Sequence, residues 1–254
     1  MNLISIILPY FRKRYFIEKT INSIISQKYK NFEVIIIYDQ HDDDDADFII
    51  QLIKNDKRFK LYKNYRNYGV SFSRNKGINL SKGEYLCFLD GDDIWDENKL
   101  EIQFNFMKKN NILISHTSYK IINNKDQIIG SMKVKKNIHY NQLLRSCDIG
   151  LSTVMFNRKI INIINFPEIA TKEDYVLWLR IVKKVDIIGI NDYLTYWRKL
   201  NNSLSSSITQ SVKNGFLVYY KFENKNFFIS LVYLSMLIFF SIKKKIKQKI
   251  YKNI

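Results

Sequence analysis

Short apolar runs alternate with longer amphipathic segments over the first 110 residues of the chain. This alternation is typical of strand–helix units, which build a parallel sheet with helices on both faces. We therefore expect an α/β fold with a mostly parallel, Rossmann-like central sheet flanked by helices. The expected strands are Ile4–Leu8, Val34–Tyr38, Lys60–Tyr62 and Tyr85–Leu89, and the expected helices are Tyr15–Ser26, Ala46–Lys54, Val70–Leu80 and Asp96–Asn110.

Polar segments follow three of these expected strands directly. Open α/β sheets bind their ligands in the crevice outside the carboxyl ends of the strands. The segments to examine for chemistry are therefore Pro9–Arg12, Asp39–Asp45 and Asp90–Asp93.

After residue 110 the pattern loosens into shorter pieces. One amphipathic helix is expected at Lys172–Val185, where the apolar spacing is helical. We expect this half to complete the sheet. The strand-like pieces are Ile114–Lys120, Thr153–Asn157, Ile187–Ile190 and Leu194–Trp197.

The last segment differs in kind. Phe227–Ile242 has 16 residues without a charge, and a run of lysines without acids follows it. A helix of that length reaches roughly 24 Å, short of the ~30 Å hydrocarbon core, so the pattern favours a helix lying in the interface of an anionic membrane. The alternative is a hydrophobic helix packed on the domain or on a second subunit. The lysines are Lys243, Lys244, Lys245, Lys247, Lys249 and Lys252.

The net charge of +17 comes from the second half of the chain. Residues 101–254 contain 25 Lys and Arg against 9 Asp and Glu, whereas residues 1–100 are nearly balanced. Such an excess indicates an anionic partner, either a phosphate-bearing substrate, a membrane surface or nucleic acid, unless it only reflects an AT-rich genome. Cys87 and Cys147, with no secretory leader, form no disulfide framework and indicate a reducing, cytoplasmic compartment.

Three carboxylates stand at the end of one buried strand, in the segment GEYLCFLDGDDIW. Asp90, Asp92 and Asp93 repel one another there unless a cation or ligand hydroxyls compensate them. Mg²⁺ or Mn²⁺ suits this role, because it is commonly held by one or two carboxylates together with water and substrate phosphates. The alternative is an acidic loop that caps the following helix.

Four stretches in order resemble the inverting glycosyltransferases of family 2, which have the GT-A fold. The resemblance covers residues 3 to about 200. It implies a GT-A domain over residues 1–205, with a nucleotide-sugar-binding half (1–110) and an acceptor-binding half (111–205), followed by a helical extension (206–254). The stretches are SIILPYFRKRYFIEKTINSIISQKYKNFEVIIIYD, NYGVSFSRNKGI, LDGDDIW and KEDYVLWLR.

The resemblance implies a role for each donor-side residue. Asp39 would accept a hydrogen bond from the nucleobase, Asp90 would contact the ribose and Asp92 would hold the metal. Arg74 would lie beside the nucleotide, and Gly69 would let the backbone approach it. Further nucleotide-contacting positions are Pro9, Phe11, Gly91 and Arg198.

The family's catalytic base matches Asp174, with Glu173 as its orienting neighbour. Acids are favoured in the first turn of any helix, so capping alone is the alternative. As base, Asp174 would deprotonate an acceptor hydroxyl, which then attacks the anomeric carbon opposite the diphosphate in one displacement. The metal would neutralise the leaving diphosphate.

The chain departs from the family at its base-binding end. Phe11 can stack on a base but has no hydroxyl to donate. The stretch YWRKLNNSLSS resembles another family segment, with Arg198 and Ser203 placed to approach the diphosphate, but it lacks the histidine of some relatives. The acidic run Asp42–Asp45 is interpreted as a solvated loop rather than a second metal site. His41, His116 and His139 lack ligand spacing.

Two competing functions remain open, a nucleotidyltransferase on a related sheet and a non-catalytic nucleotide-sugar-binding module. The first usually has a glycine-rich loop after its first strand, and LPYFRKRYF has none. Nucleic-acid binding is not expected, because most Tyr and Phe residues lie in apolar periodic runs. The hypothesis is therefore a nucleotide-sugar donor, a glycan or lipid-diphosphate-linked acceptor, and peripheral attachment to the inner face of the cell membrane.

Overall fold

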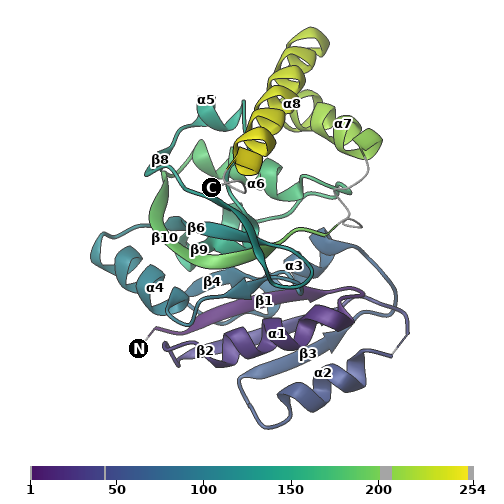
Figure 1. The fold of residues 1–254 in the computed structure, drawn as a ribbon, viewed down its shortest axis with the longest axis vertical. Coiled ribbons are helices and arrows are strands. Elements are labelled where there is room, and N and C mark those ends of the chain that lie inside the picture. Colours follow the sequence, from purple (N-terminus) through teal and green to yellow (C-terminus); the bar gives the residue numbers. More distant parts are fainter. Residues whose placement is uncertain (1, 43, 201–207, 251–254) are drawn as a thin grey trace.

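A computed structural model describes residues 2–42, 44–200 and 208–250, with side chains as far as Lys244. Ser203 and Lys252, named above, lie outside the described residues, as does Asp43. One ten-stranded sheet forms the centre of the molecule (Figure 1). The strands are β1 (Ile4–Tyr10), β2 (Phe32–Tyr38), β3 (Phe59–Lys63), β4 (Tyr85–Phe88), β5 (Ile94–Trp95), β6 (Ile114–Ile122), β7 (Ile128–Met132), β8 (Asn137–Ile138), β9 (Val154–Asn157) and β10 (Ile187–Arg198).

Helices cover both faces of this sheet and one end of the molecule (Figure 1). Two short 3₁₀ segments, η1 (Leu151–Thr153) and η2 (Arg158–Ile163), flank β9. A π-helical turn, η4 (Val218–Phe222), follows α7. The α-helices are α1 (Arg14–Ile25), α2 (Ala46–Ile53), α3 (Val70–Leu80), α4 (Lys99–Lys109), α5 (Tyr140–Leu143), α6 (Glu173–Val182), α7 (Ile208–Leu217) and α8 (Phe227–Ile250).

The sheet is parallel in its first half and mixed beyond it. Its order is β3-β2-β1-β4-β9-β6-β10-β5, with β7 paired to β6 and β8 to β10. The neighbours β3, β2, β1 and β4 are parallel, whereas β9 is antiparallel to both β4 and β6. The expected α/β architecture is confirmed: the strands of the first half are parallel, and β6 and β10 form one further parallel pair beyond the antiparallel β9.

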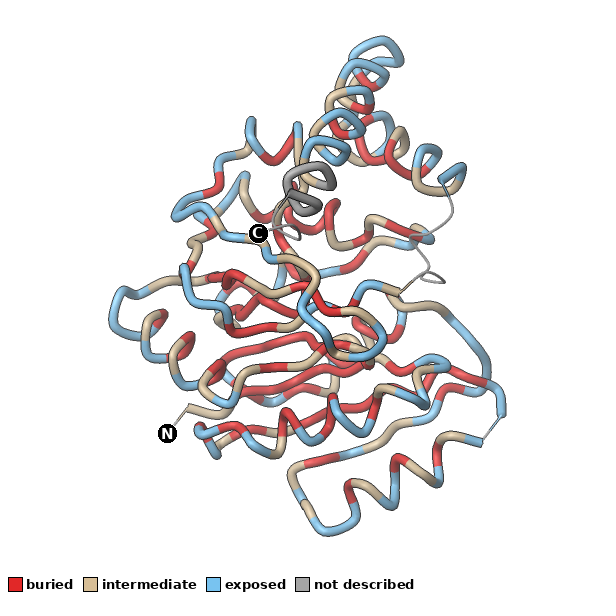
Figure 2. Tube along the Cα trace, in the orientation of Figure 1, coloured by how far each residue is buried: buried red, intermediate tan, exposed pale blue. Residues whose placement is uncertain are grey.

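Two apolar layers explain why β1 and β2 consist almost entirely of Ile, Val and Leu. Side chains alternate between the faces of a strand. Ile4, Ile6 and Leu8 pack on one side with α1, α2 and α4, whereas Ile7 packs on the other side with α3 and α6. Both faces of these strands are buried, as Figure 2 shows by the red central strands. The burial explains why their apolar runs have no polar alternation.

The segments expected at Ile187–Ile190 and Leu194–Trp197 form one strand, β10. Its pairing with β6 shifts register between Ile190 and Tyr193 and again between Tyr193 and Thr195. Polar residues lie at this irregularity, and extra residues in one strand are what a β-bulge accommodates. The break in the apolar pattern therefore marks a bulge and not the end of a strand.

Helix α8 lies with α7 at the end of the molecule remote from α1 and α2 (Figure 1). Ser230, Leu234 and Leu237 are buried on its inner face. The helix continues through the lysines to Ile250, so its 24 residues span roughly 36 Å. The sequence-based length of roughly 24 Å, taken from the uncharged stretch alone, was therefore too short. By length and composition, Phe227–Lys244 is the one stretch among the described residues that could cross a membrane; its mean hydropathy is 1.7 and 17% of it is buried.

Candidate active site

The carboxyl ends of β1, β2 and β4 meet at one edge of the sheet, because the three strands are parallel neighbours. β1 and β2 end in register at Tyr10 and Tyr38, whose rings stack with centroids 5.3 Å apart. The polar segments predicted to carry chemistry all leave the sheet at this edge. The structure therefore places residues 9–12, 39–42, 44–45 and 90–93 around one rim.

Arg74 connects this rim to the start of α6. Its Nη1 donates to Glu173 Oε1 at 2.5 Å, and its Nη2 donates to Asp90 Oδ1 at 2.9 Å. Burial works to lower the pKa of Arg74, but the two carboxylates outweigh it and raise that pKa above the usual value. A buried guanidinium must be paired, and charge-assisted hydrogen bonds of this kind are strong and directional. Arg74 thus brings together two acidic motifs that are far apart in the sequence.

Asp174 lies in the first turn of α6, half-buried beside this pair. Burial, and next the charge of Glu173, raise its pKa to about 7, while Arg74 and Lys172 oppose the rise. Its Oδ1 accepts a hydrogen bond from the Tyr175 backbone N–H at 2.7 Å. A carboxylate whose pKa lies near neutrality is suited to accept a proton as a general base.

The residue before this acidic pair is held in an uncommon backbone conformation. Lys172 has φ +71° and ψ +19°, in the left-handed region that costs a non-glycine residue about 1–2 kcal/mol. The turn allows α6 to begin at Glu173, so both acids point from the first helical turn. The left-handed turn thereby sets where the carboxyl groups of Glu173 and Asp174 lie at the start of α6.

Asp92 forms an ion pair with Lys13, 2.6 Å from Nζ to Oδ2. Burial raises the pKa of Asp92; the Lys13 ammonium opposes this and Asp90 adds to it. The side chains of Asp90 and Asp92 are 35% and 14% exposed, so both remain accessible from the rim. Asp92 therefore needs a cation beside it, and the ammonium of Lys13 takes that position.

The donor set fits a divalent ion that depends on its substrate for ligands. In the described part of the chain, no group of three or more His, Cys, Asp or Glu side chains could hold a metal by itself. Mg²⁺ typically binds through one or two carboxylates plus water and phosphate oxygens, and Asp92 with Asp90 can supply the carboxylates. Phosphate oxygens and water would complete such a site.

Asp93, the third acid of the motif, has a structural role. It is buried, and its Oδ2 accepts from Ser152 Oγ at 2.6 Å while its Oδ1 accepts from the Arg198 backbone N–H at 2.8 Å. Burial and the neighbouring acids Asp92 and Asp90 raise its pKa well above the usual range. These bonds attach the acidic loop to η1 and to the end of β10.

Asp39 holds the loop between β3 and α3. Its Oδ1 accepts from Asn64 Nδ2 and the Tyr68 N–H, at 2.8 and 2.9 Å, and its Oδ2 accepts from the Gly69 N–H at 2.8 Å. The predicted contact with a nucleobase would have to use the remaining lone pair of this buried carboxylate. The structure gives Asp39 a loop-building role that sequence patterns do not indicate.

The predicted glycines differ in their surroundings. Gly69 has φ +87° at the start of α3, and a Cβ there would meet no atom within 4 Å, so the backbone borders open space. A Cβ on Gly91 would lie 3.6 Å from Lys13 Cβ, in ordinary contact. Pro9 is half-buried in β1, and Phe11 is 36% exposed at the rim. Gly69 and Phe11 are thus the members of this set that are open to a ligand.

Arg198 is turned inward. Its Nε donates to Asp92 O and its Nη1 to Asn123 O, both at 2.7 Å, while Nη2 lies 2.6 Å from Asp126 Oδ1. The side chain is buried and supports the backbone of the acidic loop. The structure thus gives the guanidinium partners other than a diphosphate, and the predicted diphosphate contact would require it to leave them.

The acidic run after β2 is tied into its loop by hydrogen bonds. Tyr10 Oη donates to Asp45 Oδ2 at 2.5 Å, Tyr38 Oη donates to Asp42 O at 3.0 Å and Gln40 Nε2 donates to Asp42 Oδ1 at 2.7 Å. The two tyrosines at the strand ends therefore hold a charged, partly exposed loop.

Sequence patterns did not reveal several neighbours of the acidic pair. Lys244 of α8 donates to Cys147 O at 2.8 Å and pairs with Asp148. Burial, and next the charge of Asp174, raise the pKa of the Cys147 thiol to about 12. The lysine-rich segment therefore reaches the surroundings of Asp174, a contact that no local signal announces because the partners are about a hundred residues apart.

Comparisons with solved structures identify the fold of the protein. S. aureus TarS in complex with UDP-GlcNAc superposes with a TM-score of 0.72 at 19% identity, covering 94% of this chain and 72% of that chain. The mannosyltransferase PcManGT from Pyrobaculum calidifontis, in complex with GDP-Man and Mn²⁺, gives 0.67 at 12% identity, over 91% and 69% of the chains. At this identity the likeness concerns the fold, which is the GT-A fold of glycosyltransferases.

The sequence comparisons establish the family. The model described as "Glycosyl transferase family 2" matches residues 5–162, and the chain belongs to this family of inverting glycosyltransferases. It is 36% identical over 213 residues to WfgD of Escherichia coli, a UDP-Glc:alpha-D-GlcNAc-diphosphoundecaprenol beta-1,3-glucosyltransferase, covering 83% of each chain. It is 32% identical over 227 residues to TuaG of Bacillus subtilis, a putative teichuronic acid biosynthesis glycosyltransferase, covering 89% and 90%. The resemblance stated from the four motifs is confirmed.

Proposed function

We propose that this glycosyltransferase moves a sugar from a nucleoside-diphosphate sugar to a lipid-diphosphate-linked glycan, with inversion, during the synthesis of a cell-surface polysaccharide or lipopolysaccharide. The observation that carries the proposal is the double contact of Arg74 with Asp90 and Glu173, which sets the donor rim beside the α6 acids. The names of WfgD and TuaG support the acceptor class. A second E. coli relative, WfaP, is a glucosyltransferase of the same name as WfgD and is 38% identical to this chain over 209 residues.

The donor would lie along the rim formed by β1, β2 and β4. Phe11 offers an exposed ring for stacking on the base, and Gly69 offers open backbone at the start of α3. Asp39 would accept a hydrogen bond from the base, and Asp90 would accept one from the ribose. Arg74 holds Asp90 in position by a hydrogen bond. Pro9, Gly91 and Arg198 would border this rim from inside the protein. Arg198 would do so through its hydrogen bond to the backbone carbonyl of Asp92.

Asp92 would hold the divalent ion, Mg²⁺ or Mn²⁺, with Lys13 moving aside or turning to the phosphates. When bound, such an ion neutralises charge on the leaving diphosphate, a contribution often worth several kcal/mol. The partial exposure of Asp92 and its present pairing with a cation support this assignment.

Asp174 would be the base. Deprotonated, it accepts the proton of the acceptor hydroxyl while that oxygen bonds to the anomeric carbon, and the bond from this carbon to the diphosphate oxygen breaks on the opposite face. Glu173 is held by Arg74 and cannot rotate toward the sugar, so it positions the helix start and raises the basicity of Asp174. One residue thus reacts and the other tunes it.

The protein would work at the cytoplasmic face of the membrane, attached peripherally through α8. An anionic surface would attract the lysine-rich end of the helix by about 1 kcal/mol per basic residue. Apolar side chains on its outer face would enter the lipid, where burying them is favourable. The residues of this outer stripe include Phe228, Leu231, Val232, Ile238, Phe239 and Ile242.

The test is transfer by the purified full chain to N-acetylglucosaminyl-diphosphoundecaprenol. UDP-Glc, UDP-GlcNAc and GDP-Man are supplied in turn with Mn²⁺, with Mg²⁺ or with EDTA, and the lipid product is measured by chromatography. We expect one donor to give product. NMR should show that the anomeric configuration of the new linkage is opposite to that of the sugar in the donor. Transfer of the nucleoside monophosphate from the donor to an acceptor, with release of the sugar 1-phosphate, would indicate the nucleotidyltransferase instead. Donor binding without turnover of any acceptor would indicate a non-catalytic module.

A further inference from the structure

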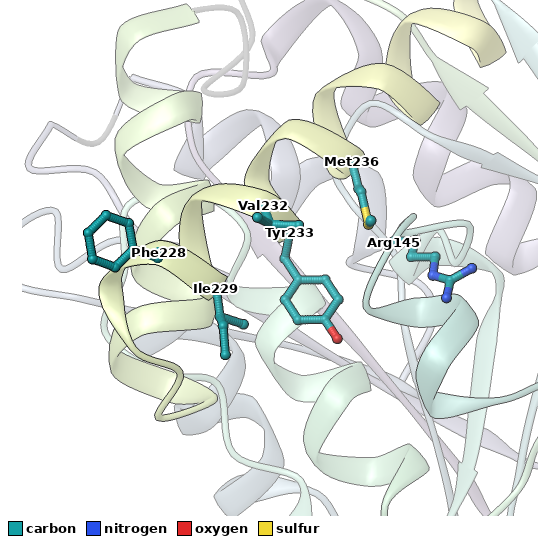
Figure 3. A pocket seen from close by; sticks show the side chains of 6 residues that line it. All are labelled: Arg145, Phe228, Ile229, Val232, Tyr233 and Met236. Carbon is teal, nitrogen blue, oxygen red and sulfur yellow. The ribbon is translucent and has the colours of Figure 1, made fainter.

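An apolar groove of about 380 Å³ runs along the side of α8 that faces the segment after α5. In Figure 3 the α8 side chains form one wall, and Arg145 lies opposite the end marked by Met236, away from Phe228. The groove is therefore lined mainly by apolar side chains, with one cationic side chain at one end. Its lining is Arg145, Phe228, Ile229, Val232, Tyr233 and Met236.

The groove is connected to the candidate base through three tyrosines. The ring of Tyr233 stacks on Tyr219 with centroids 5.4 Å apart, and the hydroxyls of Tyr219 and Tyr175 are 3.0 Å apart. Tyr175 follows Asp174 and donates its backbone N–H to that carboxylate. The wall of the groove and the base are thus held by one continuous packed cluster.

The same tyrosines fix the segment that carries Arg145. Tyr175 Oη donates to Leu143 O at 2.6 Å, and Tyr219 Oη donates to Leu144 O at 2.8 Å. Tyr219 belongs to the π-helical turn η4, a rare element that occurs frequently at functional sites. Because the carbonyls of the two preceding residues are held, the backbone position of Arg145 relative to α6 is set by the fold.

The other end of α8 also meets the surroundings of the base. Lys244 pairs with Asp148 and contacts Cys147 O. Eight residues separate Met236 from Lys244, which corresponds to roughly 12 Å along a helix. The groove thus lies about two turns of α8 from the contacts beside Asp174.

Charge and continuity distinguish among possible occupants. Arg145 is exposed and makes no ion pair within the described part of the chain, so its guanidinium is available to an anion. Phe228 and Val232 belong both to the groove and to the outer stripe of α8, so the groove opens toward the side proposed to meet lipid. A single chain with a phosphate head and an apolar tail matches this polarity.

We propose that this groove holds the first isoprenoid units of the acceptor, with Arg145 at its diphosphate, so that the glycan of the acceptor reaches Asp174. This inference rests on the proposed function and adds a binding site for the lipid part of the acceptor. α8 would then select an acceptor by its lipid as well as attach the protein to the membrane.

A matched pair of variants tests the proposal. Val232→Trp fills the groove, whereas Ser235→Trp adds the same ring to an exposed position of α8 that does not line it. Each protein is assayed with N-acetylglucosaminyl diphosphate carried on undecaprenol and on a short alkyl chain. We expect Val232→Trp to raise KM for the undecaprenyl acceptor about tenfold, the effect of no longer burying roughly two methylene groups, and to leave the short-chain acceptor unchanged. Ser235→Trp should change neither KM.

A second pair tests the cation. Arg145→Gln should raise KM for both acceptors, since both carry the diphosphate, and should leave the Kd of the donor unchanged. Lys109→Gln, at the exposed end of α4, is the control and should alter neither value. The two pairs separate the tail contact from the head contact.

Several results would overturn the groove assignment. They are equal KM values for Val232→Trp and Ser235→Trp, an equal loss with long and short acceptors, or a change of oligomeric state in light scattering that accompanies unchanged KM values. Failure of the wild-type chain to transfer any sugar to either acceptor would instead reject the proposed function. The two failures are therefore distinguishable.

Discussion

The guanidinium of Arg74 donates to Glu173 across 99 positions of sequence, at 2.5 Å, while its other terminal nitrogen donates to Asp90. One cation thereby fixes the distance between the loop that follows β4 and the first turn of α6. The distance between the proposed donor rim and the proposed base depends on this contact.

Replacing Arg74 with methionine should destabilise the protein strongly. The substitution keeps most of the side-chain volume but leaves the buried carboxylate of Glu173 without its partner, and breaking a buried pair in this way typically costs about 3–5 kcal/mol. Urea unfolding followed by circular dichroism measures the loss. Arg66→Met, on the exposed loop before α3, is the control and should stay within about 0.5 kcal/mol of the wild type. Equal stabilities of the two variants would contradict the structural role.

The rate of transfer should fall at low pH with a midpoint near 7, the value to which burial and the charge of Glu173 raise the pKa of Asp174. Only the deprotonated carboxylate can accept the acceptor's proton, so kcat/KM rises as pH increases through this value. Lys172 lowers this pKa, so Lys172→Gln should move the midpoint to higher pH. Asp174→Asn should reduce kcat by roughly 10²–10⁴ above pH 7, and its remaining rate should show no midpoint near this value. A midpoint unmoved by Lys172→Gln would argue against Asp174 as the titrating group.

The same pKa shift predicts how stability depends on pH. Since the folded-state pKa of Asp174 is raised from 3.8 to about 7, the group stabilises the fold fully below pH 3.8 and this contribution is lost as pH rises through 7. Asp174→Asn has no charge to bury, so its stability relative to the wild type should increase between these two values. Thermal unfolding at a series of pH values tests this, and parallel curves for the two proteins would be inconsistent with a raised pKa.

Lys172→Gly should stabilise the protein by about 0.5–1 kcal/mol relative to Lys172→Ala. Both changes remove the same charge, but only glycine adopts φ +71° without strain. The greater entropy of glycine in the unfolded chain reduces the gain. The midpoints of chemical denaturation give the difference directly. A more stable alanine variant would mean that the left-handed turn is not maintained in solution.

Lys13→Gln should bind Mn²⁺ more tightly than the wild type in the presence of a nucleoside diphosphate. The ammonium of Lys13 occupies the cation position beside Asp92, and a partly exposed ion pair of this kind is worth up to about 1 kcal/mol, or roughly fivefold in affinity. Calorimetric titration measures the Kd. Lys28→Gln, whose ammonium pairs with Glu97 at the surface, should leave it unchanged. Weaker binding by Lys13→Gln would show that Lys13 assists the ion and does not compete with it.

The sequence predicts most elements of the first half because each is determined locally. Val70–Leu80 is found with the expected bounds, and the four expected strands of this half lie within two residues of those observed at each end. The short strands β5 and β8 carry no such signal, since two residues form a strand only when a partner is present. β10 was expected as two pieces because its bulge interrupts the apolar pattern.

The candidate site divides in the same way. Asp90, Asp92, Arg74, Glu173 and Asp174 could be named from motifs, and the structure brings their surroundings together. The inward turn of Arg198 and the loop contacts of Asp39 depend on distant partners and could not be anticipated. Lys13 belongs to the first of the four motif stretches, but only the fold brings its ammonium group into contact with Asp92.

The hydrogen bonds of Asp93 have a consequence for how the enzyme matures. Ser152 and Arg198, which shape the acidic loop, are synthesised some 60 and 100 residues after it. A nascent chain that ends between them carries a complete run of parallel strands but an unfinished loop at their edge. The edge of the sheet that carries the candidate site is therefore complete only after β10, the last strand of the described residues, has left the ribosome.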